Sequence, residues 1–119
     1  MSQSKAEKIV AELMDKVPEI EGILLLDKNG NVSVGQTITQ MNHSAIAKNA
    51  AAMITAAREL NKTIAKGDAN VAYVEGDKGY AVMANSDKAI LLAIISKDAA
   101  QSLGLIIRDL KVTLSKIQG

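Results

Sequence analysis

Residues 13–30, LMDKVPEIEGILLLDKNG, carry the strongest structural signals in the chain. The apolar spacing that leads up to Pro18 predicts a helix over residues 4–17, because the residue before a proline is disfavoured in the α region. The run GILLLD is short, apolar and bounded by turn residues, so it predicts a strand. The pair Asn29-Gly30 then predicts a type I′ hairpin turn, which leads into a second strand over residues 31–36.

The rest of the chain continues with segments of similar length. Each segment begins and ends at a polar or glycine-containing turn. The chain is predicted to form a helix over residues 43–66 that Gly67 closes, three strands over 68–75, 80–84 and 89–95, and a last helix that Ser96 caps. Short links between consecutive strands favour antiparallel pairing. Strands that are apolar on consecutive residues need a cover on both faces. The prediction is one domain over residues 1–119, an α/β sandwich (α+β) with a five-stranded antiparallel sheet. The element order is α-β-β-α-β-β-β-α, with one helix on one face of the sheet and two on the other.

Composition excludes several classes of function. The 119 residues carry 14 basic and 13 acidic side chains, and this net charge of +1 gives no electrostatic footprint for nucleic acid or for an anionic membrane. The longest apolar run, residues 89–95, is far shorter than the roughly 20 residues of a membrane-spanning helix. No secretory signal precedes the first helix. We therefore expect a cytoplasmic protein that neither binds nucleic acid nor inserts into a membrane.

The chain lacks the residues that catalysis and metal binding usually need. It has no cysteine and one histidine, His43, so a structural zinc site and a Cys–His pair are excluded. Neither a phosphate-binding P-loop nor a dinucleotide fingerprint is present. Residues 27–31 resemble a calcium loop only superficially, because the glycine is fourth rather than sixth. We predict no catalytic residue, no metal and no cofactor.

The middle helix carries more apolar surface than a helix on a sheet requires. Its predicted buried stripe is Ile46, Ala50, Met53, Ala57, Leu60 and Ile64. A second seam of small residues would let a twin helix approach closely in a symmetric dimer. The edge strand 68–75 carries no proline, lysine or arginine that would prevent it from pairing with another strand. The predicted dimer interface therefore combines four residues of the helix with two of this strand: Ala45, Asn49, Ala52, Ala56, Val71 and Tyr73. The alternative is that these alanines only raise helix propensity.

The last helix shows a smaller excess of the same kind. Leu105 and Val112 are seven residues apart and lie outside its main apolar stripe. They indicate either a partner surface or two isolated exposed apolar residues, which are common on any protein.

The chain resembles the Roadblock, or dynein light-chain type, domain family. The resemblance rests on the order of the predicted elements, on residues 13–30 and on residues 85–96 (NSDKAILLAIIS). The likeness covers nearly the whole chain and is greatest for compact prokaryotic or archaeal members similar to bacterial Mgl-type polarity regulators. Several members carry a Pro-x-Gly turn before the last strand, where this chain has Asn85-Ser86-Asp87.

The resemblance implies a dimer, with itself or with a second Roadblock chain, joined through the middle helices and third strands. It also implies a small Ras-like GTPase as partner and a non-enzymatic scaffold or regulator that could modulate GTP hydrolysis. The residues expected to contact the GTPase are Lys48, Thr55, Arg58, Glu59 and Lys62. Arg58 could act on the GTPase in trans, or it could be a solvated or ion-paired surface residue. Two alternative functions stay open, a small-molecule sensor of the PAS or GAF type and a structural subunit of a larger assembly.

Overall fold

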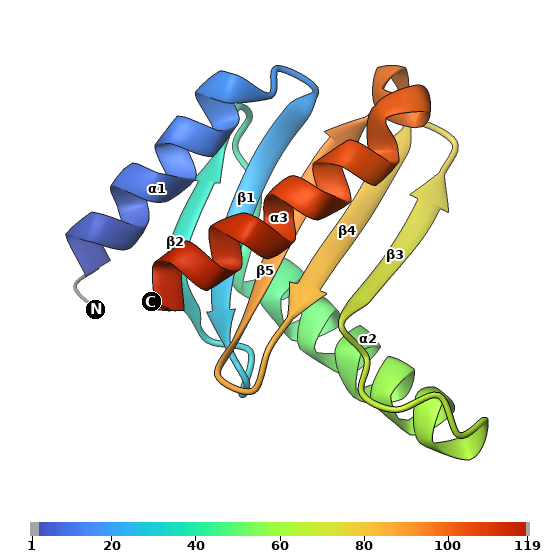
Figure 1. The fold of residues 1–119 in the computed structure, drawn as a ribbon. Coiled ribbons are helices and arrows are strands. Elements are labelled where there is room, and N and C mark those ends of the chain that lie inside the picture. The colour runs from blue at the N-terminus through green and yellow to red at the C-terminus, as the bar shows by residue number, and fades with distance from the viewer. Residues whose placement is uncertain (1–2, 119) are drawn as a thin grey trace.

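The computed structural model describes residues 3–118 and is drawn in Figure 1. Its elements follow the predicted order, with one 3₁₀ helix added before the last α-helix. They are α1 (Gln3–Lys16), β1 (Ile20–Asp27), β2 (Val32–Thr37), α2 (His43–Thr63), β3 (Val71–Gly76), β4 (Gly79–Asn85), β5 (Ala89–Ser96), η1 (Lys97–Ser102) and α3 (Leu103–Gln118). The side chain of Ser96 accepts a hydrogen bond from the Asp98 amide, so Ser96 is a helix cap as predicted, but it caps η1 and not α3, which begins at Leu103.

The five strands form a single antiparallel sheet in the order β2-β1-β5-β4-β3. β1 and β5 lie in the middle, and these are the strands with consecutive apolar residues. Their side chains are buried on both faces of the sheet, as the neighbours Leu24 and Leu25 show at 0% and 7% exposure. The more polar β2 and the short β3 form the two edges.

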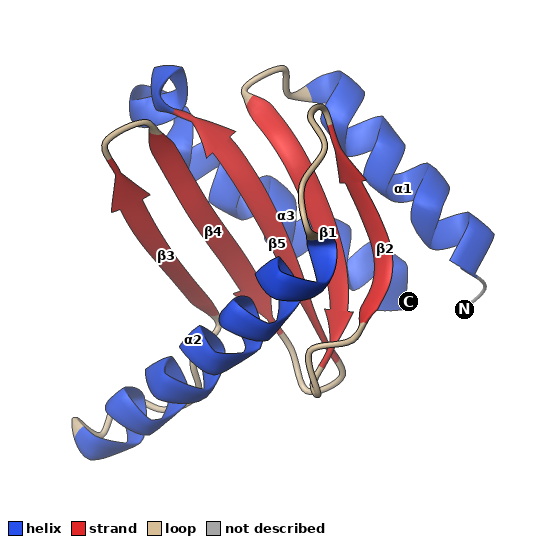
Figure 2. Ribbon diagram, turned by 180° about the vertical axis from the view of Figure 1, so that it is seen from behind, coloured by secondary structure: helices blue, strands red, loops and turns tan. Residues whose placement is uncertain are grey.

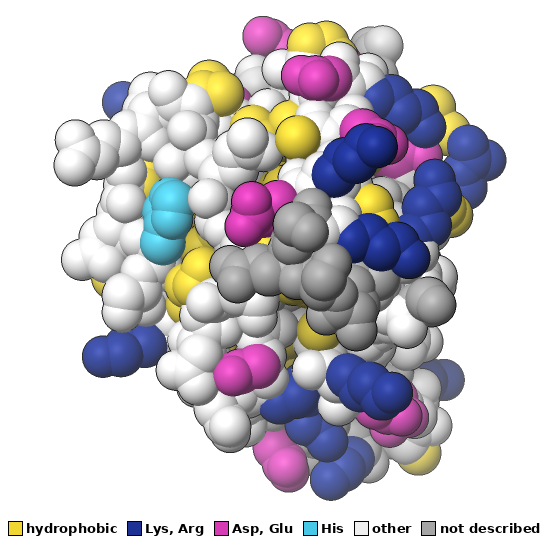
Figure 3. Space-filling model, turned by 90° about the vertical axis from the view of Figure 1, so that its left-hand side faces the viewer, with side chains coloured by type: hydrophobic (Ala, Val, Ile, Leu, Met, Phe, Trp, Pro, Cys, Tyr) yellow, Lys and Arg dark blue, Asp and Glu magenta, His cyan; other side chains and the backbone are white. Residues whose placement is uncertain are grey.

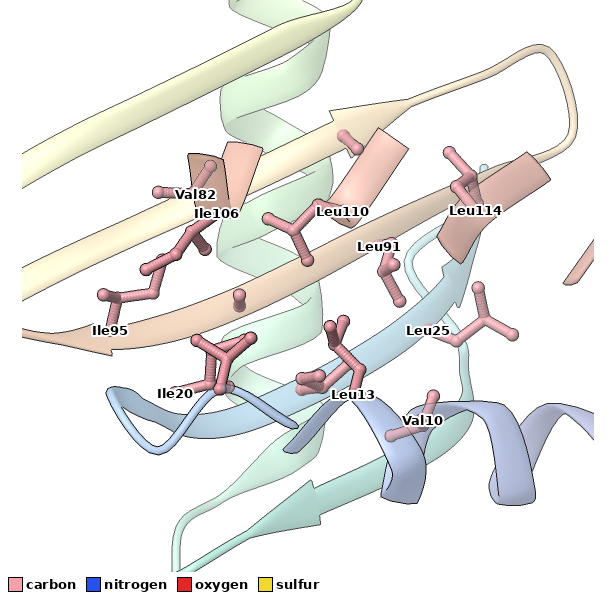
Figure 4. Close-up of a cluster of buried hydrophobic side chains, with 14 of the residues drawn as sticks. Val10, Leu13, Ile20, Leu25, Val82, Leu91, Ile95, Ile106, Leu110 and Leu114 are labelled. Atoms are coloured by element: carbon pink, nitrogen blue, oxygen red, sulfur yellow. The ribbon is translucent and has the colours of Figure 1, made fainter. Parts of the chain in front are cut away.

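The helices cover the two faces unequally. α1 and α3 lie together on one face, and α2 lies alone on the other (Figures 1 and 2). The α1–α3 side holds the larger apolar core, where Val10, Leu91 and Leu110 meet (Figure 4). The α2 side holds a smaller core that includes Ile54 and Leu92. The predicted sandwich, with one helix on one face and two on the other, is confirmed.

The turn between β1 and β2 differs from the predicted type I′ turn. Only Gly30, with a φ of +85°, has the positive φ that a type I′ turn requires at both central residues. A carboxylate organises the loop instead: Asp27 Oδ1 accepts hydrogen bonds from the amides of Asn29 and Asn31, each 2.9 Å long. These hydrogen bonds, with the one from Asn31 first, lower the pKa of Asp27 below its ordinary value of 3.8.

The end of α2 also differs from the prediction. The helix stops at Thr63 rather than at residue 66, and the residue with left-handed backbone that closes it is Ala65, at a φ of 59°, rather than Gly67. Lys66 N donates to Asn61 O at 2.8 Å, and Ala65 N donates to Lys62 O at 3.2 Å. These two bonds make a Schellman motif, in which an alanine occupies the usual glycine position.

Candidate interaction surface

The face that α2 presents to the sheet differs from the predicted stripe. Its buried residues are Ala47, Ala50 and Ile54, which are 0%, 5% and 2% exposed. Of the predicted stripe, Ala50 is confirmed, and Ile46, Met53 and Ala57 are only partly buried. Leu60 and Ile64 are 59% and 50% exposed, so the prediction is wrong for them. The small side chains of Ala47 and Ala50 allow α2 to lie close to the strands. By helical spacing, one flank beside this buried face carries Ile46, Met53, Leu60 and Ile64.

That apolar flank continues beyond the sheet. The C-terminal part of α2 projects past the edge strand β3 in both ribbon views (Figures 1 and 2). The projecting end lies near the start of β3, because Asn61 Nδ2 contacts the carbonyl oxygen of Asp68 at 3.5 Å. Leu60 and Ile64 therefore have no strand of their own chain to cover them.

A shallow apolar hollow lies on the same face of the sheet, at the opposite end of β3. Val74, Ala81 and Ile94 stand in register across β3, β4 and β5. Together with the glycines of the β3–β4 turn they line an open hollow of about 370 Å³, and Val74 is 50% exposed. α2 crosses the sheet at some distance from this corner, so the hollow is not covered (Figure 2).

The predicted dimer residues of α2 lie on its outer side. Ala45, Asn49, Ala52 and Ala56 are all exposed. Asn49 is oriented by a hydrogen bond of 3.1 Å from its side-chain amide to the Ala45 carbonyl oxygen. These four residues form a smooth outer strip along the helix.

The two predicted dimer residues of β3 lie on the opposite face of the sheet. Val71 packs against the α1–α3 core, and Tyr73, two residues along the strand, is 51% exposed on that side. Sequence reasoning thus found residues of both edge elements. It missed two features: Leu60 and Ile64 are exposed at the end of α2, and an apolar corner of the sheet around Val74 is uncovered.

An ion pair restrains the edge strand itself. Lys97, which follows β5, forms an ion pair with Glu75, donates to the Gly76 carbonyl oxygen at 3.2 Å, and lies 5.2 Å from the ring centroid of Tyr80. The hydrogen bond to Glu75 raises the pKa of Lys97. These contacts hold the end of β3 against β4 and β5, while the outer backbone edge of β3 has no neighbouring strand.

The predicted GTPase-contacting residues form a polar strip on the other flank of α2. All five are exposed, namely Lys48, Thr55, Arg58, Glu59 and Lys62. Thr55 donates to the carbonyl oxygen of Ala51 at 3.0 Å, and Lys62 lies 4.0 Å from Glu59. Arg58 has no ion pair among residues 3–118, so the predicted alternative of an intrahelical pair for Arg58 is wrong.

Arg58 lies at the rim of a polar corner that Lys28, Asn85 and Asp87 also line. Lys28 Nζ in that corner donates to Asn85 Oδ1 at 2.7 Å and to the Ser86 carbonyl oxygen at 2.9 Å, which ties two hairpins together. Burial, and then the charge of Arg58, lower the pKa of Lys28, while Asp87 acts in the opposite direction. The corner is a structural junction with one exposed arginine at its rim.

His43 has a positioning role at the start of α2. Its Nε2 is 3.1 Å from Thr37 Oγ1. Because the Thr37 hydroxyl donates its proton to the Thr39 carbonyl oxygen at 2.6 Å, Thr37 Oγ1 accepts the hydrogen bond from the histidine. The ring also lies over Gly35, where an added Cβ would come within 2.5 Å of Nδ1. Asn42, the N-cap, accepts a hydrogen bond from the Ala45 amide. These contacts fix where α2 enters the sheet surface.

Residues 3–118 offer neither a metal site nor a membrane-spanning helix. No group of three or more His, Asp or Glu side chains is arranged to hold a metal ion. No helix in this range is both long and apolar enough to cross a lipid bilayer.

The chain belongs to the Roadblock/LC7 domain family, whose family model matches residues 6–96. Similar solved structures include MglB of Myxococcus xanthus, at 23% identity over 98% of this chain and 89% of that chain, with a TM-score of 0.84. A Roadblock/LC7 domain from Streptomyces avermitilis is 17% identical over 94% of this chain and 96% of its own, with a TM-score of 0.80. Profilin II of Acanthamoeba castellanii aligns more loosely, at 11% identity over 95% and 98% of the two chains and a TM-score of 0.68. At these identities the likeness establishes the shared fold. Among curated protein sequences, none matches the chain significantly.

Proposed function

We propose that the protein is a non-enzymatic, dimeric scaffold or regulator that binds a small Ras-like GTPase, with residues 1–119 acting as one Roadblock-like unit. Membership of the Roadblock/LC7 family supports the class of function. The observation that carries the proposal is the exposed apolar end of α2 beside an unpaired edge strand.

The dimer follows from symmetry. β3 is the last strand of the sheet, and a second copy of β3 can pair with it in antiparallel fashion about a two-fold axis perpendicular to the sheet. Antiparallel pairing places the start of one β3 beside the end of the other. The projecting end of α2 lies at the start of β3, and the uncovered hollow lies at its end. Each α2 therefore extends over the hollow of the partner copy.

The two surfaces match chemically. Leu60 and Ile64 supply exposed apolar side chains, and the hollow is lined by Val74, Ala81 and Ile94. Both sets would be removed from water at the same time, which is the main source of affinity in such contacts. Val71 and Tyr73 lie in the paired strands, and the outer residues Ala45, Asn49, Ala52 and Ala56 follow α2 from the β2 edge of the sheet toward the partner copy.

The GTPase is proposed to bind the α2 layer of this dimer. The polar strip Lys48, Thr55, Arg58, Glu59 and Lys62 faces solvent on the flank away from the apolar residues. It offers exposed charges of both signs without a deep pocket, which suits contact with another protein surface. In this proposal the chain supplies a surface, and the chemistry of GTP hydrolysis belongs to the GTPase.

The test is a titration with a small Ras-like GTPase of the source organism, loaded with a non-hydrolysable GTP analogue. The variant Lys48→Glu/Lys62→Glu should weaken binding at least about tenfold, because it reverses two charges of the strip. Lys111→Glu/Lys116→Glu on α3 is the matched control, with the same charge change on the other face. Equal affinities for the wild type and the α2 variant would contradict the proposed GTPase site.

A further inference from the structure

β2 forms the second edge of the sheet, and its outer side has no neighbouring strand. After a bulge at the start of β2, its register with β1 is regular over residues 34–37. Ile38 N donates to the Glu21 carbonyl oxygen at 2.9 Å, so the even-numbered residues of this stretch bond to β1. The backbone amides and carbonyl groups of Gly35 and Thr37 therefore point outward, at the spacing that an added strand requires.

A hollow of about 260 Å³ lies along this edge. Its lining consists of four consecutive residues of β2, residues 33–36, and one residue of α1, Glu7. α1 lies on the outer side of β2 in both ribbon views, so it forms a wall of the space next to the strand (Figures 1 and 2). A hollow lined by consecutive residues of one edge strand matches the shape of an extended chain.

The β2 edge lacks the charges that usually keep an edge strand from pairing. Residues 29–47 contain no Asp, Glu, Lys or Arg, although charged residues make up 23% of the chain. Charged side chains, lysine above all, are a common protection of exposed edges. In Figure 3, which views this edge, Lys and Arg side chains gather on the side of α1, and the side of the histidine is largely uncharged. Three exposed apolar side chains border the edge, namely Val32, Ile38 and Met41.

Glu7 is the one charged residue among those that line the hollow. It forms no ion pair within residues 3–118. No basic residue lies three or four positions away from it on α1, so its own helix does not neutralise it. The hollow therefore presents one negative charge beside the outward backbone groups of β2.

We propose that the β2 edge binds an extended segment of a partner protein, which adds to the sheet as a further strand and carries a lysine or arginine that pairs with Glu7. The backbone of the segment bonds to the outward groups of Gly35 and Thr37, and its apolar side chains contact the exposed Ile38. In strand addition the main-chain hydrogen bonds supply affinity, and alternate side chains supply specificity.

A second copy of the chain is a poorer occupant of this edge. Antiparallel pairing of two β2 strands about an axis perpendicular to the sheet would place both α1 helices on the same face, above the shared edge. Packed helices need about 8–10 Å between their axes, whereas paired strands lie only about 4.8 Å apart. A single extended segment brings no helix to the edge, so it fits beside α1.

The site lies at the opposite edge of the sheet from β3. It stays open when two copies pair through β3, and it uses none of the residues proposed to contact the GTPase. The inference therefore does not depend on the proposed dimer or on the GTPase, and a scaffold built this way holds a further partner at its outer edge.

The test is a selection against the full chain from a display library of random linear peptides of about 10 residues, which is long enough for a strand. Enriched peptides should combine β-branched or aromatic residues with a lysine or arginine. In an added strand only every second amide faces β2, so N-methylation of one alternate set of peptide amides should lower affinity at least about tenfold, while methylation of the other set should not. Hydrogen exchange at the amides of Gly35 and Thr37 should slow at least about tenfold when the peptide binds.

Charge reversal on α1 tests the pairing with Glu7. Glu7→Lys should weaken the peptide at least about tenfold. Glu12→Lys is the matched control, because it makes the same change at an exposed position of the same helix outside the hollow, and it should bind the peptide like the wild type. Circular dichroism melting curves check that both variants are folded.

The proposal is overturned if no peptide is enriched, or if both methylated sets bind like the unmodified peptide, because a segment that binds without main-chain hydrogen bonds is not an added strand. It is equally overturned if Glu12→Lys weakens binding as much as Glu7→Lys. Slow exchange at Gly35 and Thr37 in the peptide-free chain that is lost on dilution would instead assign the edge to a second copy.

Discussion

Replacing the two exposed apolar residues at the end of α2 by serine, Leu60→Ser/Ile64→Ser, should separate dimerisation from folding. Both side chains face solvent within their own chain, at 59% and 50% exposure, so the variant should fold as the wild type does. In the proposed dimer the same side chains lie over the hollow around Ala81 of the partner copy. Their loss should act on association alone.

The magnitude follows from these exposures. Complete burial of a leucine or isoleucine side chain stabilises by about 1.5–3 kcal/mol. About half of each side chain remains to be buried, which gives roughly 2–3 kcal/mol for Leu60 and Ile64 together. The two-fold axis repeats the contact, so the dimer should lose about 4–6 kcal/mol, or about a thousandfold or more in dissociation constant.

Sedimentation velocity over a dilution series measures this dissociation constant. Leu105→Ser is the matched control, because Leu105 is also 59% exposed but lies on α3. The control should dimerise like the wild type. The reasoning is refuted if the double variant associates as tightly as the wild type, or if Leu105→Ser weakens the dimer by the same factor.

Three further predictions concern the fold that positions this surface. Ala65→Gly should stabilise the chain by about 0.5–1 kcal/mol, because glycine adopts the φ of 59° without the penalty of a Cβ; a lower midpoint of thermal unfolding would contradict this. Gly79→Ala should destabilise the fold by about 1–3 kcal/mol or more, since the added Cβ would stand 2.3 Å from the Ile95 carbonyl oxygen. The control is Gly76→Ala, whose added Cβ meets nothing closer than 3.5 Å, and it should melt within a few degrees of the wild type. Hydrogen bonds lower the pKa of Asp27 in the folded chain below its ordinary value of 3.8. The Asp27 carboxylate therefore stabilises the fold fully above pH 3.8, and this stabilisation is lost as the pH falls through the lower pKa of the folded chain. The difference in unfolding free energy between the wild type and Asp27→Ala should therefore shrink in acid urea titrations, and a difference that grows toward low pH would be inconsistent with the lowered pKa.

The architecture could be predicted from the sequence because its strongest signals are local. The consecutive apolar residues of β1 and β5 require a cover on both faces, and the short turns allow only antiparallel neighbours. The type I′ turn was wrong because the Asp27 carboxylate caps two amides and stabilises a longer loop, an effect that the pair Asn29-Gly30 does not reveal.

The orientation of α2 could not be predicted for a different reason. Helical periodicity shows which residues share a face, but not where the sheet beneath the helix ends. Leu60 and Ile64 follow the apolar period of the helix, yet they lie beyond β3 and remain exposed. Alanines such as Ala47 and Ala52 suit a close contact and a solvated face equally well, so composition alone could not distinguish the buried alanine from the exposed one. The predicted dimer and GTPase residues are exposed or lie at the edge strand, and their roles stay predictions.

The molar mass of the wild-type chain in solution, measured by light scattering after gel filtration over a dilution series, bears on the whole proposal at once. Two copies of the 12.6 kDa chain give 2 × 12.6 = 25.2 kDa, and we predict this mass down to low micromolar concentration. A folded monomer of 12.6 kDa at every concentration would contradict the homodimer and with it the joined α2 surface proposed for the GTPase.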